Sequence, residues 1–459
     1  MRLVGLDLGT TRLKAAAYRP DGTLLAATSR PLAISRPFAG WVEQEPEGWW
    51  QAVRDVLGEI GGADALAICG QINTHVFLDG DGRPLRPAIS WADIRSAEIG
   101  RAASPPVPAS SAEARYRWLR ANEPAVASRV RRIVVPKDFL NFRLTGAFAT
   151  DPSSAPDLVM GTAYRATIAP DLRAMLSPIA PETEVVGTVG GMRVAVGAMD
   201  SVAAVYGCGD LDAGTAFDVS GTSETVGILS RQERPSLGIR GVVVMPAHYL
   251  HAGPTQAGAG SVEWALAAYA PNLTWDGFFD AARSAGPRFD GPIFLPYLLG
   301  ERAPLWDPEA RGVFFGLSTA HVQAHLCRAA LEGVAFAIRH LLETIESGIP
   351  ERASRIFVSG GGAVSALWNQ IKADVTGRVV CRPDNVETGT LGAAMIAAAA
   401  AGVYPSLGAA MAGMRPAFAR IDPGPDCLGY DAPYAIFREL YPALHECFAH
   451  LAAIRARPV

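Results

Sequence analysis

The sequence has no excess of basic residues, since 41 Lys and Arg against 45 Asp and Glu give a formal net charge of −4 over 459 residues. Surfaces that bind nucleic acid or anionic membranes depend on clustered cations, so we expect neither partner and favour small molecules. Long apolar runs are also missing. The longest, Ala393–Val403, has about half the length that crosses a bilayer, and its alanines suit a packed helix.

Cysteines are few and scattered, with six in the chain and no C-x-x-C pair. This spacing argues against a disulfide framework and against a paired-cysteine metal or redox site. The first residues, Met1–Gly5, have the pattern of a strand rather than a charged and then apolar signal segment. We therefore expect a reducing, cytoplasmic location.

The chain has the length and composition of a globular protein with two hydrophobic cores. At 459 residues and 49% hydrophobic, the chain can bury two cores of about 200 residues each. Short apolar runs at Leu3–Leu8, Leu13–Tyr18 and Leu24–Thr28 predict strands joined by tight turns, and a similar run at 214–229 suggests a duplication. Glycines and aspartates at 207–214 interrupt the pattern, so we predict domains 1–210 and 211–459.

Strand and helix patterns alternate through both halves, which predicts an α/β fold. Further strands are expected at Ala65–Cys69 and Arg355–Val358. The expected helices are Pro46–Ile60, Val262–Tyr269, Val322–Glu346, Leu367–Val375 and Gly392–Ala401.

The turn after the first strand is the first candidate for chemistry. Asp7 stands near the end of the strand, and Gly9-Thr10-Thr11 lead back into the next strand and Lys14. Small residues let backbone N–H groups approach a phosphate, hydroxyls add donors, and Asp7 can hold a hydrated Mg²⁺. A plain β-hairpin turn has the same pattern, so this turn alone is weak evidence.

Two later loops strengthen the interpretation as a nucleotide site. Ser220-Gly221-Thr222-Ser223 repeats the first turn in the second half, and nucleotide clamps of this kind hold phosphates between two hairpins. A glycine run, Gly360–Gly362, follows a strand and precedes a helix that contains Asn369. Glycines there let a flat adenine lie against the backbone. The alternative for this run alone is a flexible loop.

Together with further segments, these loops resemble the FGGY family of carbohydrate kinases nearly from end to end. Trp41–Trp50 resembles W-x-E-Q-x-P-x-x-W-W, and Trp91–Arg95 resembles W-x-D-x-R. Other segments that resemble family landmarks are Gly70-Gln71, Pro136–Leu140, Leu144–Gly146, Thr150-Asp151, Gly197–Ser201, Phe294–Pro304 and Arg311–Leu317.

The resemblance implies two actin-like (ribonuclease H-like) α/β domains, each with a mixed five-stranded sheet, and a nucleotide and sugar cleft between them. It implies an ATP-dependent kinase that uses ATP and Mg²⁺ and phosphorylates a hydroxyl of a small-molecule sugar. Asp200, otherwise more simply a helix N-cap, becomes the catalytic base that accepts the hydroxyl proton. The remaining implied roles are Asp7 for the metal; Thr10, Thr11, Lys14, Gly221 and Thr222 for the phosphates; Gly361, Gly362 and Asn369 for adenosine; and Gln71, Asn73, Thr74, Trp91, Asp93 and Asp200 for the sugar.

The chain departs from its relatives where the sugar is chosen. Ile72 and Asn73 occupy positions that read Met-His or Arg-Glu in two subfamilies. The stretch from Trp91 to Trp118 is shorter than its family counterpart, and Ser110–Ala114 replaces a segment that usually resembles F-T-A-P-K, in a region that helps to wall the sugar site in relatives. An uncharged Asn suits a neutral ketose or polyol at least as well as a sugar acid, and the first candidate is D-xylulose or a related ketopentose. Gluconate, ribulose, erythritol and glycerol stay open, as do a weakened sugar sensor, an actin-like ATPase and a homodimer.

Overall fold

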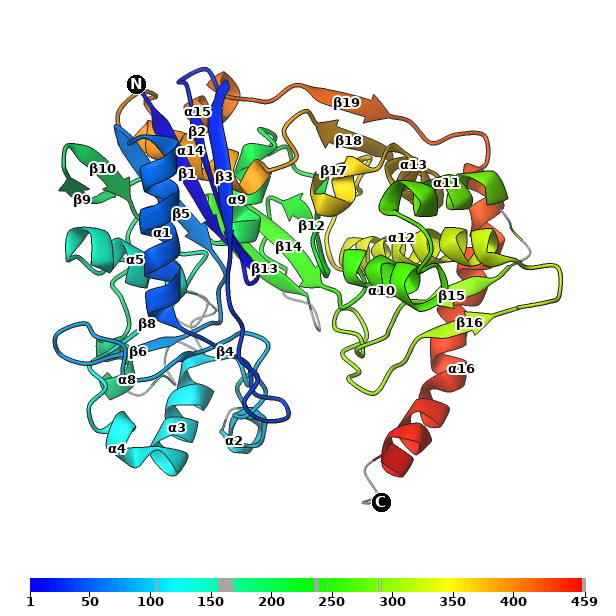
Figure 1. Ribbon diagram of the computed structural model, residues 1–459, viewed down its shortest axis with the longest axis horizontal. Helices are drawn as coiled ribbons and strands as arrows, with labels where there is room; N and C mark the ends of the chain where they lie inside the picture. Colours follow the sequence, from blue (N-terminus) through cyan, green and yellow to red (C-terminus); the bar gives the residue numbers. More distant parts are fainter. Residues whose placement is uncertain are drawn as a thin grey trace. The chain divides into compact units, whose positions relative to one another are not determined.

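The computed structural model describes residues 1–104, 106–155, 168, 170–234, 239–245, 247–287, 289 and 291–455. The chain forms two compact units (Figure 1). Unit 1 comprises Met1–Gly209 and Thr388–Pro416, and unit 2 comprises Asp210–Glu387 and Ala417–Val459. The sequence predicts one boundary near residue 210, whereas in the structure a late segment of the chain belongs to unit 1.

Unit 1 is built on a six-stranded mixed sheet in the order β3-β2-β1-β5-β10-β9. Strand β1 runs antiparallel to β2 and parallel to β5, which in turn runs parallel to β10. Edge strands β3 and β9 are antiparallel to their neighbours. The strands are β1 (Leu3–Leu8), β2 (Arg12–Tyr18), β3 (Leu24–Pro31), β5 (Ala65–Gly70), β9 (Val185–Val189) and β10 (Met192–Ala195).

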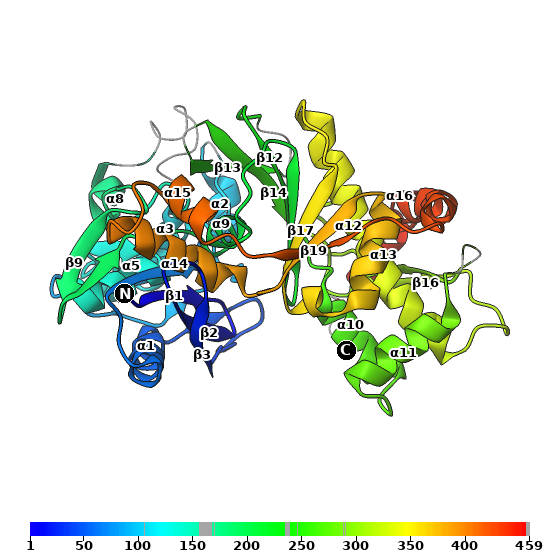
Figure 2. The same cartoon turned by 90° about the horizontal axis from the view of Figure 1, so that it is seen from above.

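Helices cover both faces of this sheet. Figure 2 shows α1 (Pro46–Ile60) and α14 (Thr388–Ala400) on opposite faces of β1 and its neighbours. Helix α1 begins with a proline and turns Trp49, Val53 and Val56 toward the sheet at helical spacing. Helix α5 (Pro136–Thr145) packs on the same side, against α1 and β5.

The late segment joins unit 1 because α14 packs unusually close to β1 and to α9 (Asp200–Gly207). A Cβ added at Gly5 of β1 would lie 1.9 Å from the Thr390 carbonyl oxygen. On the other side, a Cβ at Gly392 would lie 1.8 Å from the Ala203 carbonyl oxygen. Backbone contact at these distances requires glycine, and such pairs of distant glycines carry no local sequence signal. Helix α15 (Leu407–Gly413) follows α14 in the same unit.

A smaller layer of unit 1 carries two short antiparallel pairs, β4 (Glu43–Gln44) with β7 (Ala88–Ile89) and β6 (Val76–Leu78) with β8 (Arg132–Val134). Its core contains Phe77, Ile89 and Trp118. The short helices of this layer are α2 (Ala97–Ala102), α3 (Ala112–Asn122), α4 (Pro124–Ala127) and α8 (Pro170–Met175).

Unit 2 repeats the topology of unit 1 in a seven-stranded sheet ordered β13-β14-β12-β11-β17-β18-β19. The first strand, β11, is again antiparallel to the next and parallel to a later strand, β17, which is parallel to β18. The two sheets thus have six and seven strands, not the five expected for each. The strands are β11 (Thr215–Ser220), β12 (Glu224–Ser230), β13 (Arg240–Met245), β14 (His248–Pro254), β17 (Arg355–Gly360), β18 (Val379–Pro383) and β19 (Phe418–Ile421).

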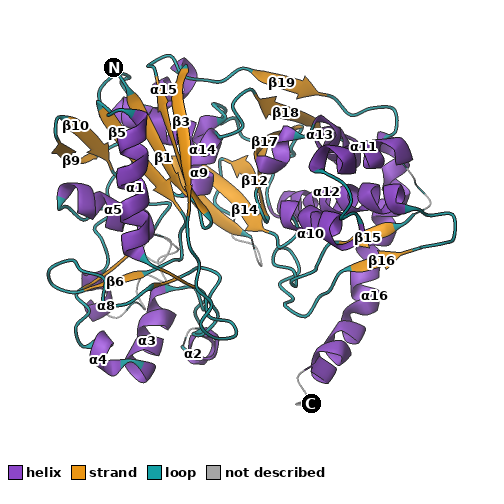
Figure 3. Ribbon diagram, viewed as in Figure 1, coloured by secondary structure: helices purple, strands orange, loops and turns teal. Residues whose placement is uncertain are grey.

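The helices of unit 2 surround a core that includes Phe294, Phe336 and Trp368, and Figure 3 distinguishes them from the strands. They are α10 (Ala259–Tyr269), α11 (Trp275–Ala285), α12 (Gln323–Gly348), α13 (Ala366–Thr376) and α16 (Asp431–Arg455). A separate pair, β15 (Ile293–Leu295) and β16 (Val313–Phe315), is antiparallel. The strands and helices predicted from sequence periodicity are confirmed, with ends shifted by a few residues.

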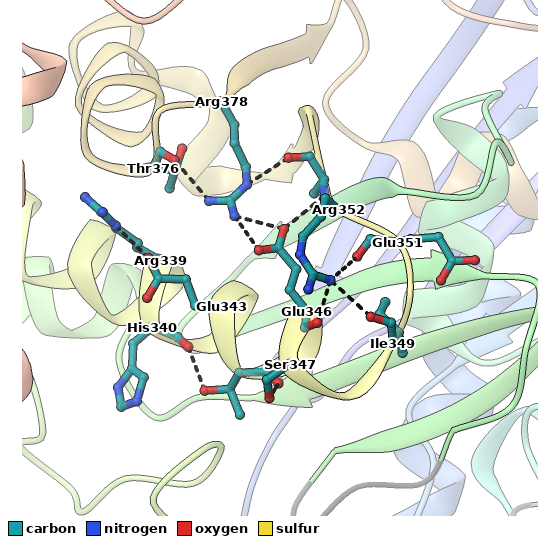
Figure 4. Close-up of polar contacts among 12 residues, drawn as sticks. Arg339, His340, Glu343, Glu346, Ser347, Ile349, Glu351, Arg352, Thr376 and Arg378 are labelled. Carbon is teal, nitrogen blue, oxygen red and sulfur yellow. Dashed lines mark hydrogen bonds and ion pairs between the residues drawn. The ribbon is translucent and has the colours of Figure 1, made fainter.

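Arginines fix the C-terminal end of α12 (Figure 4). The Arg352 guanidinium donates to the carbonyl oxygens of Glu346, Ile349 and Glu351 at 2.6–3.0 Å. Arg378 forms two hydrogen bonds with the Glu346 carboxylate, at 2.9 and 2.8 Å. The last carbonyls of a helix have no intrahelical donor, and here the Arg352 side chain supplies one. Among the described residues, no helix is long and apolar enough to cross a membrane.

Candidate active site

In unit 1, the loops that follow three parallel strands meet at one edge of the sheet. Gln71, after β5, donates its backbone N–H to the Leu8 carbonyl of β1 at 3.1 Å. Gly70 donates to the carbonyl of Ala198, in the loop after β10, at 3.2 Å. The carboxyl ends of parallel strands are the usual binding edge of an α/β sheet. Three predicted segments, the first phosphate turn, the sugar loop and the Asp200 loop, are therefore neighbours.

A closed hydrogen-bond network joins the phosphate turn to the sugar loop. The Trp91 indole donates to the Thr10 hydroxyl at 2.9 Å, and that hydroxyl donates to Gln71 Oε1 at 3.3 Å. The Thr74 hydroxyl also donates to Gln71 Oε1, at 3.1 Å, and accepts from the Trp91 backbone at 3.1 Å. Gln44 Nε2 donates to the Thr10 carbonyl at 2.9 Å, and Gln44 Oε1 accepts from Gln71 at 2.9 Å.

In the sequence, Gln44 is one residue of the Trp41–Trp50 segment, and no local signal predicts a role for it. In the structure it is buried and connects the two loops.

The carboxylates of Asp7 and Asp200 both act on the buried thiol of Cys69. Burial is the main cause that raises the pKa of Cys69, and the negative charges of Asp7 and Asp200 raise it further. Asp7 also lies directly opposite Lys14 in the β1–β2 pairing. The two predicted acidic residues are thus within electrostatic range of one buried atom.

Asp200 is the first residue of α9, and Met199 occupies the N-cap position. The N-cap alternative for Asp200 is therefore wrong. Burial raises the pKa of Asp200, and a hydrogen bond from the Ser201 backbone N–H, at 2.7 Å, partly opposes this shift. A carboxylate whose pKa is raised by burial is a better proton acceptor.

The remaining predicted residues of unit 1 differ in accessibility. Thr11 is exposed, and its carbonyl accepts from Leu32 at 2.8 Å. Asn73 has a φ of 56°, a left-handed conformation that Asn tolerates better than most residues. Asp93 is 1% exposed, and its carboxylate accepts from the Val42 backbone N–H and from Arg95. Asp93 therefore anchors the loop after Trp91.

Arg115 of α3 holds the sugar loop from behind, a role that sequence reasoning missed. Its fully buried guanidinium donates to the carbonyls of Asn73 and Ser90, and contacts His75 Nδ1 at 2.8 Å. Burial, and then the Arg115 charge, keep the pKa of His75 well below its usual value. Arg115 follows directly after Ser110–Ala114, the segment that departs from the family pattern.

In unit 2, the second hairpin turn packs on the start of α10. Ala259 and Gly260 donate their backbone N–H groups to the carbonyls of Gly221 and Thr222, both at 3.0 Å. A Cβ added at Gly258 would lie 2.7 Å from Ser223 Cα, so the close packing requires glycine. Gly221 and Thr222 themselves are exposed.

Arg302 also reaches this hairpin. Its Nη2 lies 3.1 Å from the Ser223 hydroxyl and 2.6 Å from the Thr255 carbonyl. The sequence indicated this residue only as part of a C-terminal family segment.

The glycine run lies beside the same hairpin, because Gly360 pairs with Ser220 in the β11–β17 register. A Cβ at Gly362 would lie 1.9 Å from Ser220 Oγ, whereas a Cβ at Gly361 would meet nothing within 4 Å. Asn369 is fully buried and donates to the Ala363 carbonyl at 2.8 Å. Asn369 therefore supports the turn after the glycines.

A buried ionic cluster lies beneath the hairpin. Lys372 Nζ of α13 is 2.5 Å from Asp218 Oδ2 and 3.9 Å from Glu224 Oε1, and all three side chains are at most 1% exposed. The Ser220 hydroxyl donates to Glu224 Oε1 at 2.7 Å. Burial and then the Asp218 charge raise the pKa of Glu224 well above its usual value, and Lys372 opposes this shift.

No group of three or more His, Cys, Asp or Glu side chains within the described ranges is arranged to hold a metal ion. A single carboxylate is nevertheless compatible with Mg²⁺, which usually binds one or two carboxylates together with substrate phosphates and water. Asp7 fits this requirement by the chemistry of its single carboxylate, and Gly389 packs against it so closely that a Cβ there would come within 2.6 Å of Asp7 Oδ2.

The chain matches models of both domains of one family. The model of the N-terminal domain of the FGGY family of carbohydrate kinases matches residues 2–215, and that of the C-terminal domain matches residues 217–401. The xylulose kinase of Escherichia coli (strain K12) is 30% identical over 443 residues, which cover 88% of this chain and 91% of that protein. The gluconokinase of Bacillus subtilis (strain 168) is 26% identical, with 89% of each chain covered.

A solved structure is similar over almost the whole length. The crystal structure of xylulose kinase from Rhodospirillum rubrum superposes with a TM-score of 0.85 and 28% identity, covering 98% of this chain and 100% of that chain. This similarity extends over the residues of both units.

Proposed function

Because the chain belongs to the FGGY family of carbohydrate kinases, with the actin-like fold and ATP-dependent sugar kinase activity of that family, we propose that it phosphorylates a hydroxyl of a ketose, D-xylulose or a related ketopentose. The observation that carries the proposal is the uncharged network of Thr10, Gln71, Thr74 and Trp91 beside the Asp200 loop. Amide and hydroxyl groups suit the hydroxyls of a neutral sugar.

We favour a neutral sugar over an aldonate because of where Arg115 is directed. Its guanidinium is fully buried and donates to the Asn73 and Ser90 carbonyls, so contact with a substrate carboxylate would require these bonds to break. The relatives named xylulose kinase agree with this choice. The relatives named gluconokinase make gluconate the second candidate.

In the proposed reaction, Asp200 accepts the proton of the sugar hydroxyl while that oxygen attacks the γ-phosphorus in line with the leaving ADP oxygen. The raised pKa of Asp200 suits this role. Gln71, Asn73, Thr74, Trp91 and Asp93 are proposed to form and support the sugar site.

Unit 2 is proposed to hold the nucleotide, with Gly221 and Thr222 at the phosphates and Gly361, Gly362 and Asn369 forming the adenosine side. From unit 1, Thr10, Thr11 and Lys14 are proposed to assist at the phosphates. Asp7 would hold Mg²⁺, which when bound supplies charge neutralisation at the phosphates. We also propose a reducing, cytoplasmic environment, since the six cysteines are scattered along the chain with no C-x-x-C pair.

A coupled assay of ADP release tests the proposal over a panel of ketopentoses, polyols and aldonates, with wild type and Asp200→Asn. We expect D-xylulose or a related ketopentose to give the highest kcat/KM, and Asp200→Asn to lower kcat by about 10²–10⁴-fold. A higher kcat/KM for gluconate than for any ketopentose would refute the proposed substrate class. If no sugar stimulates ADP release, a sugar sensor or an ATPase becomes the better interpretation.

A further inference from the structure

The family segments Pro136–Leu140 and Thr150-Asp151 have no part in the proposed reaction, yet the structure brings both beneath the loop that carries Asp200. Lys137 of α5 lies 2.7 Å from Asp138 Oδ1 and 3.0 Å from Asp151 Oδ1. The Lys137 side chain is fully buried, and those of Asp138 and Asp151 are 2% exposed. A buried ionic cluster of this kind is rigid because each charge depends on its partners.

One hydroxyl connects this cluster to the Asp200 loop. Ser153 Oγ donates to Asp151 Oδ2 and accepts the backbone N–H of Met199 at 3.0 Å. Met199 immediately precedes Asp200 and is the N-cap of α9. Because Asp151 also accepts the Ser153 backbone N–H, at 2.9 Å, the hydroxyl has little freedom to turn.

The N-terminal end of the loop, at Val196, is held by helix α5, which also carries Lys137. Lys137 Nζ lies 3.3 Å from the Val196 carbonyl, and Asn141 Nδ2 donates to that carbonyl at 2.9 Å. Two residues, Gly197 and Ala198, thus lie between two anchors, Val196 and Met199.

We infer that Ser153 is a positioning residue that, held by Asp151 and Lys137, fixes the Met199 backbone and thereby sets the place of the Asp200 carboxylate. This inference rests on the proposed function, in which Asp200 is the base. Displacement of a reacting group by about 1 Å can cost about 10²-fold in rate, so a hydroxyl that does not touch substrate can still control kcat.

The test compares Ser153→Ala with Ser154→Ala. Ser154 is the neighbouring buried serine, and its Oγ has no hydrogen-bond partner within the described part of the chain. With the best sugar of the panel, we expect Ser153→Ala to lower kcat roughly 10–100-fold while the sugar Kd and the KM for ATP change less than about twofold. Ser154→Ala should behave as wild type, and Ser153→Thr, which keeps the hydroxyl, should restore most of kcat.

Two further measurements separate positioning from a loss of stability. Hydrogen exchange of the Met199 amide should accelerate in Ser153→Ala and not in Ser154→Ala. Adding Ser153→Ala to Asp200→Asn should cause no further loss of kcat, because the group being positioned is already absent. If Ser153→Ala folds poorly, Ser153→Cys keeps the volume with a weaker acceptor and should show the same changes in smaller degree.

The inference alone is overturned if Ser153→Ala matches Ser154→Ala in kcat and exchange, or if it lowers the residual activity of Asp200→Asn by its full factor. If instead Asp200→Asn turns over sugar at the wild-type rate, the base assignment in the proposed function fails and the catalytic role of Ser153 fails with it. The variant that departs from expectation therefore identifies which of the two is wrong.

Discussion

Replacing Lys372 with Met should destabilise unit 2 strongly at neutral and alkaline pH. The ammonium group lies 2.5 Å from Asp218 and 3.9 Å from Glu224, and all three side chains are buried to 99% or more. Met has a similar length but leaves the carboxylates without a cation. Removing one partner of a buried ion pair typically costs about 3–5 kcal/mol, because the other charge stays buried and uncompensated.

The pH dependence of this loss is the sharper part of the prediction. Glu224 already has a pKa raised by burial and by Asp218, and Lys372 opposes that rise. Without Lys372, the folded-state pKa of Glu224 should be higher still, so the folded state of the variant binds more protons than the unfolded state. The penalty should then shrink as pH falls toward the pKa of an ordinary carboxyl group and be largest above the raised folded-state pKa of Glu224.

Urea unfolding of Lys372→Met at about pH 8 and about pH 5.5, with hydrogen exchange of β11 and α13 as the local probe, measures both effects. The double variant K372M/D218N should recover most of the stability at the higher pH, since the substitution removes one uncompensated charge. Arg83→Met, at an exposed ion pair whose side chains are 75% and 69% accessible, is the matched control and should change little. A loss that is below about 1 kcal/mol, or equal at both pH values, would refute the reasoning.

Three further predictions concern other parts of the two units. Gly362→Ala should lower stability and weaken ATP binding, because the new Cβ would lie 1.9 Å from Ser220 Oγ. Gly361→Ala should leave the melting temperature unchanged, because a Cβ there would meet nothing within 4 Å. Equal melting temperatures for the two variants would contradict this prediction. Burial raises the pKa of Glu301 to about 7, so between about pH 4.5 and 7 this residue is ionised in the unfolded state before it is ionised in the folded state. The free energy of unfolding of wild type should therefore fall by up to about 3 kcal/mol over this range. Glu301→Gln should flatten this dependence of stability on pH, as measured by urea unfolding. The kcat–pH profile should fall on the acid side with a midpoint above that of an ordinary Asp, because protonated Asp200 cannot accept a proton and burial raises its pKa; an acid limb at the usual Asp pKa would oppose the assignment.

Local patterns were sufficient to predict most elements of the fold. Strands β1, β2, β5 and β17 and helix α1 follow from apolar runs, periodicity and turn residues, all of which act over a few neighbouring residues. The phosphate turns were visible for the same reason, because a glycine and hydroxyl turn after a strand is a local signal. The carboxyl ends of parallel strands then explain why Asp7, Gln71 and the Asp200 loop share one edge of unit 1.

Local patterns and the family resemblance therefore predict the α/β class, the repeated hairpins and the candidate residues for phosphate and proton chemistry. How those residues are held depends on packing that the folded chain alone reveals: the return of α14 to unit 1, the Arg115 anchor behind the sugar loop, and the Lys137 and Lys372 clusters. Except for the adjacent Lys137–Asp138 pair, these depend on contacts between residues that are separated in the chain. A buried Lys or Arg is stable only where an acid or carbonyl meets it. When that partner comes from another segment, as Asp218 does for Lys372, the neighbouring sequence does not identify it.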